Sequence, residues 1–328
     1  MDVELLPKLQ GEKRDQWMAF LRRMSLEPDE GVEKTALIWE DGAIAATGSR
    51  QGNVLKCIAV DPLFQGEGLT ATLLTHLRQD AFADGMRHLF LYTKPRNLNM
   101  FSSLFFYPVA KTGQVLLMEN QQDGIAGFLK GLDKPCTGGN IGAIVMHCNP
   151  FTRGHRWLIE TAAKECDWLY IFVLSEDRGL FPAADRLELV KKGTADLANV
   201  TVHPTGPYLI SSATFPTYFL KDKAQAGAVQ CQLDVEIFTK HFVPAFGINR
   251  RYVGTEPLCV VTNAYNEVLE EFLPKQGVEL RKLQRLETDG APISASAVRK
   301  LLGQNQPEKL RSLVPDTTFE YLLSHNMI

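Results

Sequence analysis

The stretch IGAIVMHCNPFTRGHRWLIETAA, residues 141–163, decides the fold of the second half of the chain. The apolar run Ile141–Met146 predicts a buried strand, and Arg156–Ala163 predicts a helix whose apolar residues recur on one face. Thr152 and His155 would therefore lie in a tight turn between them, at the carboxyl edge of a sheet. Open α/β sheets bind nucleotides at that edge. A helix N-terminus there offers free N–H groups and partial positive charge to phosphate.

A second segment, ISASAVR at residues 293–299, predicts another helix start. Ser294 takes the N-cap position before apolar residues at helical spacing. Such a start would bring the hydroxyls of Ser294 and Ser296 and the guanidinium of Arg299 to a polyphosphate. Taken alone, each segment also suits an ordinary turn or a capped helix. Their order, spacing and strand–turn–helix context together favour a nucleotide site.

The rest of this half alternates strands and helices, which predicts a parallel, doubly wound sheet. Right-handed crossovers would place the turns that follow the strands on one edge, and so bring His155 and Arg299 together. The expected strands are Ile141–His147, Trp168–Leu174, Val200–His203, Arg251–Gly254 and Val278–Lys282. The expected helices are Gly154–Cys166, Ala183–Leu197, Ala264–Phe272 and Ser294–Leu302.

The two segments resemble the T-x-G-H and I-S-x-S/T-x-x-R motifs of the nucleotidylyltransferase superfamily, which attacks the α-phosphate of ATP and expels pyrophosphate. The resemblance implies that His155, helped by Thr152, stabilises charge on the α-phosphoryl group. These residue types suit the chemistry, because nucleotidyl transfer depends mainly on positioning and electrostatic stabilisation. The implied ATP-binding set is Asn149, Pro150, Phe151, Gly154, Gly254, Glu256, Ser294, Ser296 and Arg299, the last three holding the β- and γ-phosphates.

Further candidates follow the later strands. Arg178 comes after the second strand, where related enzymes keep a basic residue for the acceptor or the phosphates. Arg186 resembles the arginine of the family's R-x-E/D helix, although it could equally be a surface arginine paired with a carboxylate. Gly254 and Glu256 belong to a G-T-E triplet that relatives place against the nucleotide. Such triplets are also found in plain turns.

The loop GPYLISSATFP, residues 206–216, is rich in hydroxyl and aromatic groups. A hydroxyl-lined apolar pocket would suit a small carboxylate, which needs donors at one end and a methyl-sized space at the other. Ser211 and Ser212 are therefore candidate substrate residues. The alternative is a rigid connector bounded by prolines.

The first half of the chain predicts a different, α+β fold. Strands are expected at Thr35–Trp39, Ala43–Thr47, Leu55–Val60, His88–Thr93 and Val115–Met118, and helices at Leu69–Asp84 and Leu98–Phe105. This order resembles the GNAT acetyltransferase fold. The turn QGEGLT, residues 65–70, fits the GNAT pyrophosphate pattern Q/R-x-x-G-x-G/A, except that Thr70 replaces the final small residue. The resemblance implies a CoA-like or pantetheine ligand cradled by backbone N–H groups at Gln65, Gly66, Gly68 and Thr70.

Catalysis by this half is not implied, because no single acid or base stands out. Tyr107 lies where many GNAT enzymes keep a tyrosine near the thiol, but an aromatic core residue is an equal alternative. Turn-forming and polar residues cluster between Glu119 and Gly142. We therefore expect a GNAT-like domain over residues 1–122, a linker over 123–139, and a Rossmann-like nucleotidylyltransferase domain over 140–328.

Composition narrows the class of protein. The 328 residues are 45% hydrophobic and 22% charged, which is ordinary for a globular protein. A formal charge of −3 and a pI near 6.2 give no electrostatic footprint for nucleic acid or an anionic membrane. No signal peptide is apparent, and the longest strongly apolar stretch, Leu169–Leu174, is too short to span a bilayer. Six scattered cysteines without metal-ligand spacing predict free thiols and a cytoplasmic protein.

The two halves together resemble the citrate (pro-3S)-lyase ligase family, over essentially the whole chain. The segments NPFTRGH, GPYLISSATFP and ISASAVR carry this resemblance in that order. It implies an acid–thiol ligase that activates acetate with ATP as acetyl-adenylate and releases pyrophosphate. The acetyl group would then pass to the prosthetic-group thiol of the citrate lyase acyl carrier subunit, with release of AMP. Mg²⁺ would be held mainly by the ATP phosphates, and no protein metal site is expected.

Three other functions remain open at this point. An adenylyltransferase of a pantetheine or nicotinamide nucleotide would transfer AMP to an acceptor phosphate. A related ligase that acetylates tRNA also uses acetate and ATP, but the absence of a basic surplus argues against RNA. A regulator could bind ATP and CoA without turnover, although the intact motif hydroxyls and His155 argue against it.

Overall fold

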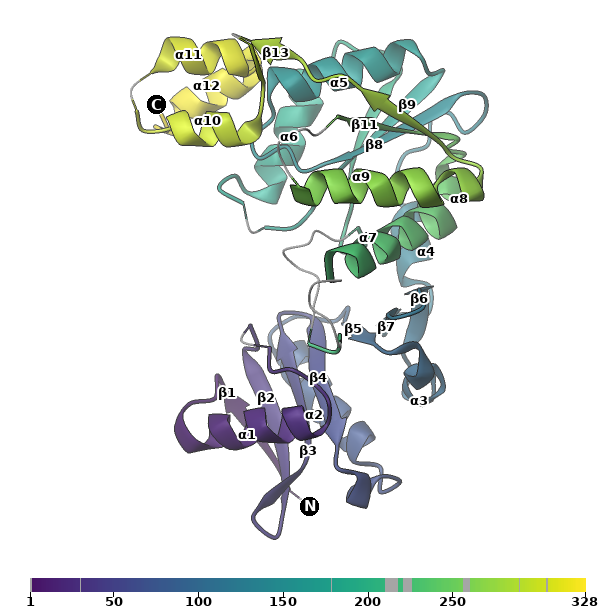
Figure 1. The fold of residues 1–328 in the computed structure, drawn as a ribbon, viewed down its shortest axis with the longest axis vertical. Helices are drawn as coiled ribbons and strands as arrows, with labels where there is room; N and C mark the ends of the chain where they lie inside the picture. Colours follow the sequence, from purple (N-terminus) through teal and green to yellow (C-terminus); the bar gives the residue numbers. More distant parts are fainter. Residues whose placement is uncertain are drawn as a thin grey trace. The chain divides into compact units, whose positions relative to one another are not determined.

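The computed structural model describes residues 2–29, 31–177, 179–209, 218–220, 226–255, 260–288, 290–304 and 306–328. The chain forms two compact units, which Figure 1 draws coloured along the sequence. Unit 1 consists of Met1–Ile125 and Phe215–Val229, and unit 2 of Ala126–Thr214 and Gln230–Ile328. The division of the sequence into domains 1–122 and 140–328 stays a prediction.

Unit 1 is built on a seven-stranded mixed sheet of order β1-β2-β3-β4-β5-β7-β6. Its strands are β1 (Val3–Pro7), β2 (Lys34–Glu40), β3 (Ala43–Gln51), β4 (Val54–Val60), β5 (Phe90–Thr93), β6 (Tyr107–Lys111) and β7 (Leu116–Glu119). Its helical segments are α1 (Gly11–Arg23), η1 (Pro62–Phe64), α2 (Leu69–Ala83), η2 (Pro95–Asn97) and α3 (Leu98–Ser102). All five expected strands are present, and β1, α1 and β6 were not expected. The core lies between the sheet and α2, which buries Leu73, Leu74 and Leu77.

Strands β4 and β5 separate soon after they meet. They pair in parallel only at Val54↔Phe90 and Leu55↔Leu91. Strand β4 then continues to Val60, and β5 to Thr93, without a ladder between them. A gap therefore opens in the middle of the sheet.

Unit 2 is built on a five-stranded parallel sheet of order β10-β9-β8-β11-β12. Its strands are β8 (Ile141–Met146), β9 (Trp168–Val173), β10 (Val200–Pro204), β11 (Arg250–Gly254) and β12 (Glu279–Leu283). The expected helices are present as α5 (Arg153–Lys164), α6 (Ala183–Gly193), α9 (Val260–Phe272) and α10 (Ala295–Leu301). The prediction of a doubly wound parallel sheet is confirmed. Strands β8 and β9 are almost wholly apolar because both faces of the sheet are covered.

The winding direction of the sheet reverses between β8 and β11. These strands pair only at Arg250↔Gly142 and Arg251↔Ala143, so they diverge towards their carboxyl ends. In an open α/β sheet, such a reversal point is where ligands bind. Both the turn after β8 and the end of β11 at Gly254 reach this edge.

Several helical elements were not expected from the sequence. They are α4 (Gly124–Lys130), α7 (Ala226–Ile237), the π-helix η4 (Phe238–Phe242), α8 (Val243–Phe246), η5 (Pro274–Gln276), α11 (Pro307–Leu313) and α12 (Asp316–Ser324). A short hairpin of β13 (Glu287–Thr288) and β14 (Ala291–Pro292) precedes α10. Helix α4 occupies part of the stretch expected as linker, because Ile125 and Leu129 are buried. Among the described helices, none is long and apolar enough to cross a membrane.

Candidate active site

The turn between β8 and α5 is shaped by its own side chains. Thr152 is the N-cap of α5, and its hydroxyl accepts a hydrogen bond from the backbone N–H of His155 at 3.3 Å. In return, Nδ1 of His155 accepts from the backbone N–H of Thr152 at 3.1 Å. This reciprocal capping satisfies two N–H groups that a helix start would otherwise leave unpaired. The histidine is therefore fixed at the first turn of the helix.

This arrangement defines the chemistry of His155. Because Nδ1 accepts a hydrogen bond, the proton of the neutral ring is assigned to Nε2. Burial lowers the pKa of His155 to about 4, with smaller contributions from the positive charge of Arg285 and from the neighbouring His147. The imidazole is thus neutral at pH 7. Among the described residues, none accepts a hydrogen bond from its Nε2–H. Phe151 supports the ring, since the two centroids lie 6.0 Å apart with planes inclined by 12°.

The second motif begins α10 as expected. Ser294 is its N-cap, and its Oγ accepts from the backbone N–H of Ala297 at 3.1 Å. Arg299 donates from Nη2 to Oγ of Ser296 at 3.0 Å, and from Nη1 to the backbone carbonyl of Asn149. The last bond joins the two motifs directly.

A glycine also joins the motifs. A side-chain carbon at Gly154 would lie 2.9 Å from the backbone oxygen of Ile293, closer than real contacts of this kind. The absence of a side chain at Gly154 therefore allows the start of α5 to pack against the approach to α10. The structure places the two segments side by side at one edge of the sheet, as the crossover rule predicts.

The residues before His155 shape the turn. Asn149 is buried, and its Oδ1 accepts from the backbone N–H of Phe181 at 3.1 Å. The peptide bond between Asn149 and Pro150 is cis. Phe151 is fully buried in the core of unit 2. The side chains of Asn149 and Phe151 thus face the protein interior. At the same edge, the Gly254 carbonyl accepts from Nδ2 of Asn266 at 3.2 Å.

Two basic residues near His155 were missed by the sequence analysis. Arg285 follows β12, donates from Nε to the carbonyl of Thr255 at 2.6 Å, and acts electrostatically on His155. His147 follows β8, and its pKa is lowered mainly by burial and further by Arg186 and Arg299. In the described part of the chain, Nε2 of His147 is buried without a hydrogen-bond partner. Both residues follow strands of the sheet at its carboxyl edge, so the same positional rule could have found them.

Arg186 is buried and contacts backbone carbonyls. Its side chain is fully buried, neither on the surface nor paired with a carboxylate. The guanidinium donates to four backbone carbonyls: those of Phe181 at 3.1 Å, His147 at 2.7 Å and Leu174 at 2.9 Å, and that of Glu176. These carbonyls belong to the segments that follow β8 and β9. These contacts give Arg186 a positioning role at the strand ends, and its expected contact with substrate or phosphate stays a prediction.

Four candidates lie outside the described residues: Arg178, Ser211, Ser212 and Glu256. Among the residues that the structure describes, no group of three or more His, Cys, Asp and Glu side chains could hold a metal ion.

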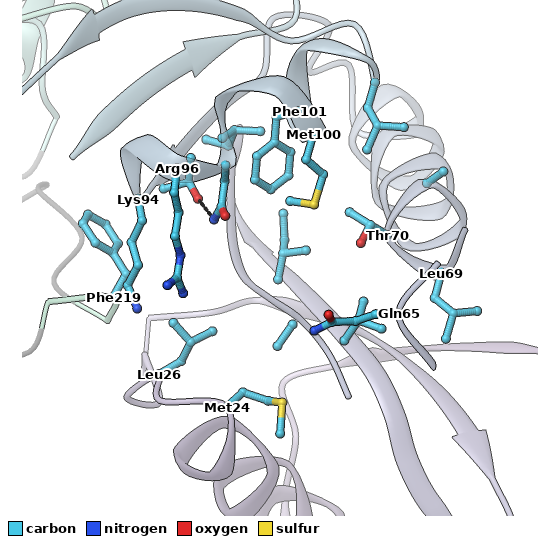
Figure 2. A pocket seen from close by; sticks show the side chains of 18 of the residues that line it. Met24, Leu26, Gln65, Leu69, Thr70, Lys94, Arg96, Met100, Phe101 and Phe219 are labelled. Atoms are coloured by element: carbon cyan, nitrogen blue, oxygen red, sulfur yellow. Dashed lines mark hydrogen bonds between the residues drawn. The ribbon is translucent and has the colours of Figure 1, made fainter. Parts of the chain in front are cut away.

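Unit 1 contains a cavity of about 820 Å³ at the gap between β4 and β5. Figure 2 shows Gln65 and Thr70 on one side of it, and Lys94 and Arg96 on another. The predicted turn residues Gln65, Gly66, Gly68 and Thr70 all line this cavity. Gly66 (φ +95°) and Gly68 (φ +76°) adopt a backbone conformation that favours glycine, and space beside them is open. Tyr107, on β6, is not among the lining residues.

Comparison with known proteins identifies the family. The family model for the citrate lyase ligase C-terminal domain matches residues 141–322, and the GNAT acetyltransferase model matches residues 6–104. A citrate (pro-3S)-lyase ligase of Klebsiella pneumoniae is 42% identical over 312 residues, covering 93% of this chain and 91% of that protein. The chain belongs to the citrate lyase ligase family.

The similarity to this family extends through both units. The citrate lyase ligase of Escherichia coli (strain K12) is 41% identical over 310 residues, 92% of this chain and 88% of that protein. A phosphopantetheine adenylyltransferase of Clostridium botulinum (strain 657) is 30% identical over 130 residues, but covers only 39% of this chain. The family expected from the sequence is thereby confirmed, and with it a ligase that combines a GNAT-like and a nucleotidylyltransferase-like domain.

Proposed function

We propose that this ligase activates acetate with ATP as acetyl-adenylate, and then acetylates the prosthetic-group thiol of the citrate lyase acyl carrier subunit. The observation that carries the proposal is the direct contact between the two motifs. Arg299 donates to the Asn149 carbonyl, and Gly154 packs against Ile293. One edge of the sheet thus gathers a neutral histidine donor, a helix N-terminus and a guanidinium, which together suit a nucleoside triphosphate.

In the first step, an acetate oxygen attacks the α-phosphorus of ATP, and the bond to the bridging oxygen of pyrophosphate breaks. Negative charge shifts onto the α-phosphoryl oxygens and the leaving group. The Nε2–H of His155 would donate to an α-phosphoryl oxygen without losing its proton, because the ring is already neutral. The positive charge of Arg285 would act in the same direction. Preorganised donors of this kind stabilise the transition state without reorganising.

The pyrophosphate side of ATP would bind at α10. The hydroxyl of Ser296 and the guanidinium of Arg299 already lie within hydrogen-bond distance of each other, at 3.0 Å. Arg299 can share its remaining donors with the β- and γ-phosphates, because a guanidinium carries five N–H groups. Ser294 would contribute to phosphate binding by capping α10, which fixes the N-terminus of this helix. Mg²⁺ would enter with ATP as its counter-ion, held mainly by phosphate oxygens.

The second step transfers the acetyl group. The acceptor sulfur attacks the acetyl carbonyl carbon, the bond from this carbon to the phosphate oxygen breaks, AMP leaves, and the thiol proton passes to solvent. We propose that the cavity of unit 1 holds the CoA-like arm that carries this thiol. The support is the pair of glycines Gly66 and Gly68, which line the cavity and have no atom within 4 Å of where a side chain would begin, so a pyrophosphate could approach the backbone there. Ser211, Ser212, Arg178 and Glu256 remain candidates for acetate, phosphate and nucleotide contacts.

Acetate-dependent exchange of labelled pyrophosphate into ATP tests the first step. We expect exchange with acetate and none without it, and loss of exchange in His155→Ala. His325→Ala is the matched control, because His325 is exposed and stacks on Tyr321 at the far end of the chain. If exchange does not depend on acetate and the chain transfers AMP to phosphopantetheine, the chain is an adenylyltransferase instead.

A further inference from the structure

The cavity of unit 1 is lined in part by Tyr218 and Phe219, from a distant part of the sequence. The last paired residues of β4 and β5 are Leu55 and Leu91, and the gap begins directly after them. At this point β4 is distorted, since Cys57 has φ +51°. The glycine turn lies beyond the opposite end of β4, after Val60. The cavity therefore has a turn end, where a pyrophosphate would bind, and a strand end near Tyr92, where β4 and β5 separate.

Tyr218 lies at the strand end of the cavity. Its hydroxyl donates to the backbone carbonyl of Tyr92 on β5 at 2.8 Å. The backbone of Cys57, on β4, makes a hydrogen bond to the same hydroxyl. One phenol thus bridges the two diverging strands where their own ladder ends. It satisfies backbone groups that would otherwise need a ligand or water.

Tyr218 makes further contacts within unit 1. Its side chain is 7% exposed, and its backbone oxygen accepts from the N–H of Glu27 at 2.8 Å. The neighbouring ring of Phe219 packs against it edge-on, with centroids 5.2 Å apart. Figure 2 shows Phe219 at the wall of the cavity, beside Lys94. Burial raises the pKa of Tyr218, so the phenol keeps its proton and remains a donor.

This arrangement limits how far a ligand can reach. An extended arm with amide groups would pair with the open edges of β4 and β5, as an added strand does. With its pyrophosphate at the glycine turn, its sulfur would point towards Tyr218. An acetyl group on that sulfur would have to enter the space of the phenol. Its carbonyl would also find the Cys57 backbone already hydrogen bonded.

We propose that Tyr218 makes the cavity select a thiol-ended arm over the acetylated arm. This inference rests on the proposed function, in which unit 1 holds the arm of the acyl carrier subunit. The unacetylated carrier would bind in the cavity, its thiol would leave the cavity to react with acetyl-adenylate, and the acetylated arm would not bind there again. This preference also makes unit 1 a poor binding site for acetyl-CoA as an acetyl donor.

Calorimetric titration of the full chain with dephospho-CoA and with acetyl-dephospho-CoA tests the inference. We expect the thiol to bind at least about tenfold more tightly, which corresponds to one buried hydrogen bond left unmade. Tyr218→Ala should remove this preference by strengthening the binding of the acetylated probe. Tyr107→Ala is the matched control, because Tyr107 is in the same unit but does not line the cavity.

A second variant guards against misfolding. Tyr218→Phe keeps the ring and frees the Cys57 backbone, so it should reduce the preference for the thiol without removing it. An unchanged preference in both variants would overturn the role of Tyr218 while leaving the arm-holding function in place. If neither probe binds to the wild-type chain, both the inference and the proposed arm site fail. Pyrophosphate exchange then still reports on the ATP site of unit 2.

Discussion

Gly154 lies directly against the backbone carbonyl of Ile293, so that a methyl group at this glycine would approach the oxygen to 2.9 Å. The two residues are far apart in the sequence, one in each motif. Their contact, together with the bond from Arg299 to Asn149, fixes the spacing between the histidine of the first motif and the guanidinium of the second. Catalysis by positioning depends on such spacings.

Gly154→Ala should therefore impair catalysis more than folding. The backbone must shift by a few tenths of an ångström, and misplacements of up to 1 Å can cost about 100-fold in rate. We expect a fall of about 10- to 100-fold in kcat for pyrophosphate exchange. Gly127→Ala is the matched control, since nothing lies within 4 Å of a side chain there. Equal loss in both variants, or none in Gly154→Ala, would contradict the packing argument.

His155→Ala should reduce kcat for acetyl-adenylate formation by about 100- to 1000-fold, the usual cost of removing one well-placed donor. The Nε2–H acts where charge develops, so kcat should fall more than the KM for ATP rises. Steady-state exchange kinetics on a folded variant measure both parameters. Wild-type exchange in that variant would refute the assignment.

Arg299→Ala should chiefly weaken ATP binding, with a rise in KM of about 10- to 100-fold for the loss of charged hydrogen bonds. Arg299→Lys should restore only part of the affinity, because an ammonium cannot reproduce the forked geometry. Lys300→Ala is the control for removal of a positive charge at an exposed neighbouring position. If ATP affinity and turnover are both unchanged in Arg299→Ala, α10 is an ordinary capped helix.

The depressed pKa of His155 also predicts a pH dependence of stability. The folded chain has a pKa of about 4 at this ring, against an ordinary value of 6.5. Between these values the unfolded chain binds a proton that the folded chain does not, so stability falls as pH drops from 6.5 to 4 and is level above 6.5. His147 and His203, whose pKa values are also lowered, act in the same direction.

Urea denaturation of the wild type and His155→Asn at pH 7.5, 6.0 and 5.0 measures this effect. The asparagine variant should lose less stability between pH 7.5 and 5.0 than the wild type does. Parallel curves for the two proteins would show that His155 does not titrate as expected.

Gly68→Val should raise the KM for the acyl carrier subunit. The side chain would project into the open space beside the turn, where the pyrophosphate of the arm is proposed to bind. A branched residue at φ +76° also strains the backbone. Gly85→Val is the matched control. Gly85 has a similar φ of +80°, so valine strains the backbone there too, but Gly85 does not line the cavity. Thiol acetylation and pyrophosphate exchange are measured in parallel. Equal loss of both in Gly68→Val would argue against an arm site.

The sequence predicted those elements correctly whose structure follows from the local pattern of apolar and capping residues. The runs around Ile144 and Ile171 are apolar because the strands are covered on both faces, and Ser294 caps its helix with its own side chain. Arg186 shows the limit: its partners are backbone carbonyls, which leave no trace in the sequence. Whether an arginine on a helix faces solvent or a strand end depends on tertiary packing.

Helix α7 was missed for a related reason. Its buried face carries Gln230 and Asp234, so the apolar periodicity that marks a helix is interrupted. Asp234 accepts from the hydroxyl of Tyr265 at 2.6 Å, and both act on the charge of the buried Arg251. A polar network of this kind becomes apparent only when three distant segments are brought together.

The position of Tyr218 within unit 1 has a consequence for how such a protein can be divided. The polypeptide leaves unit 2, contributes Tyr218 to unit 1, and returns to unit 2 at Gln230. Three crossings connect the units, so no single cleavage separates them. A fragment ending at Ile125 would lack one wall of its own cavity. Part of unit 1 is thus encoded inside the sequence that forms unit 2.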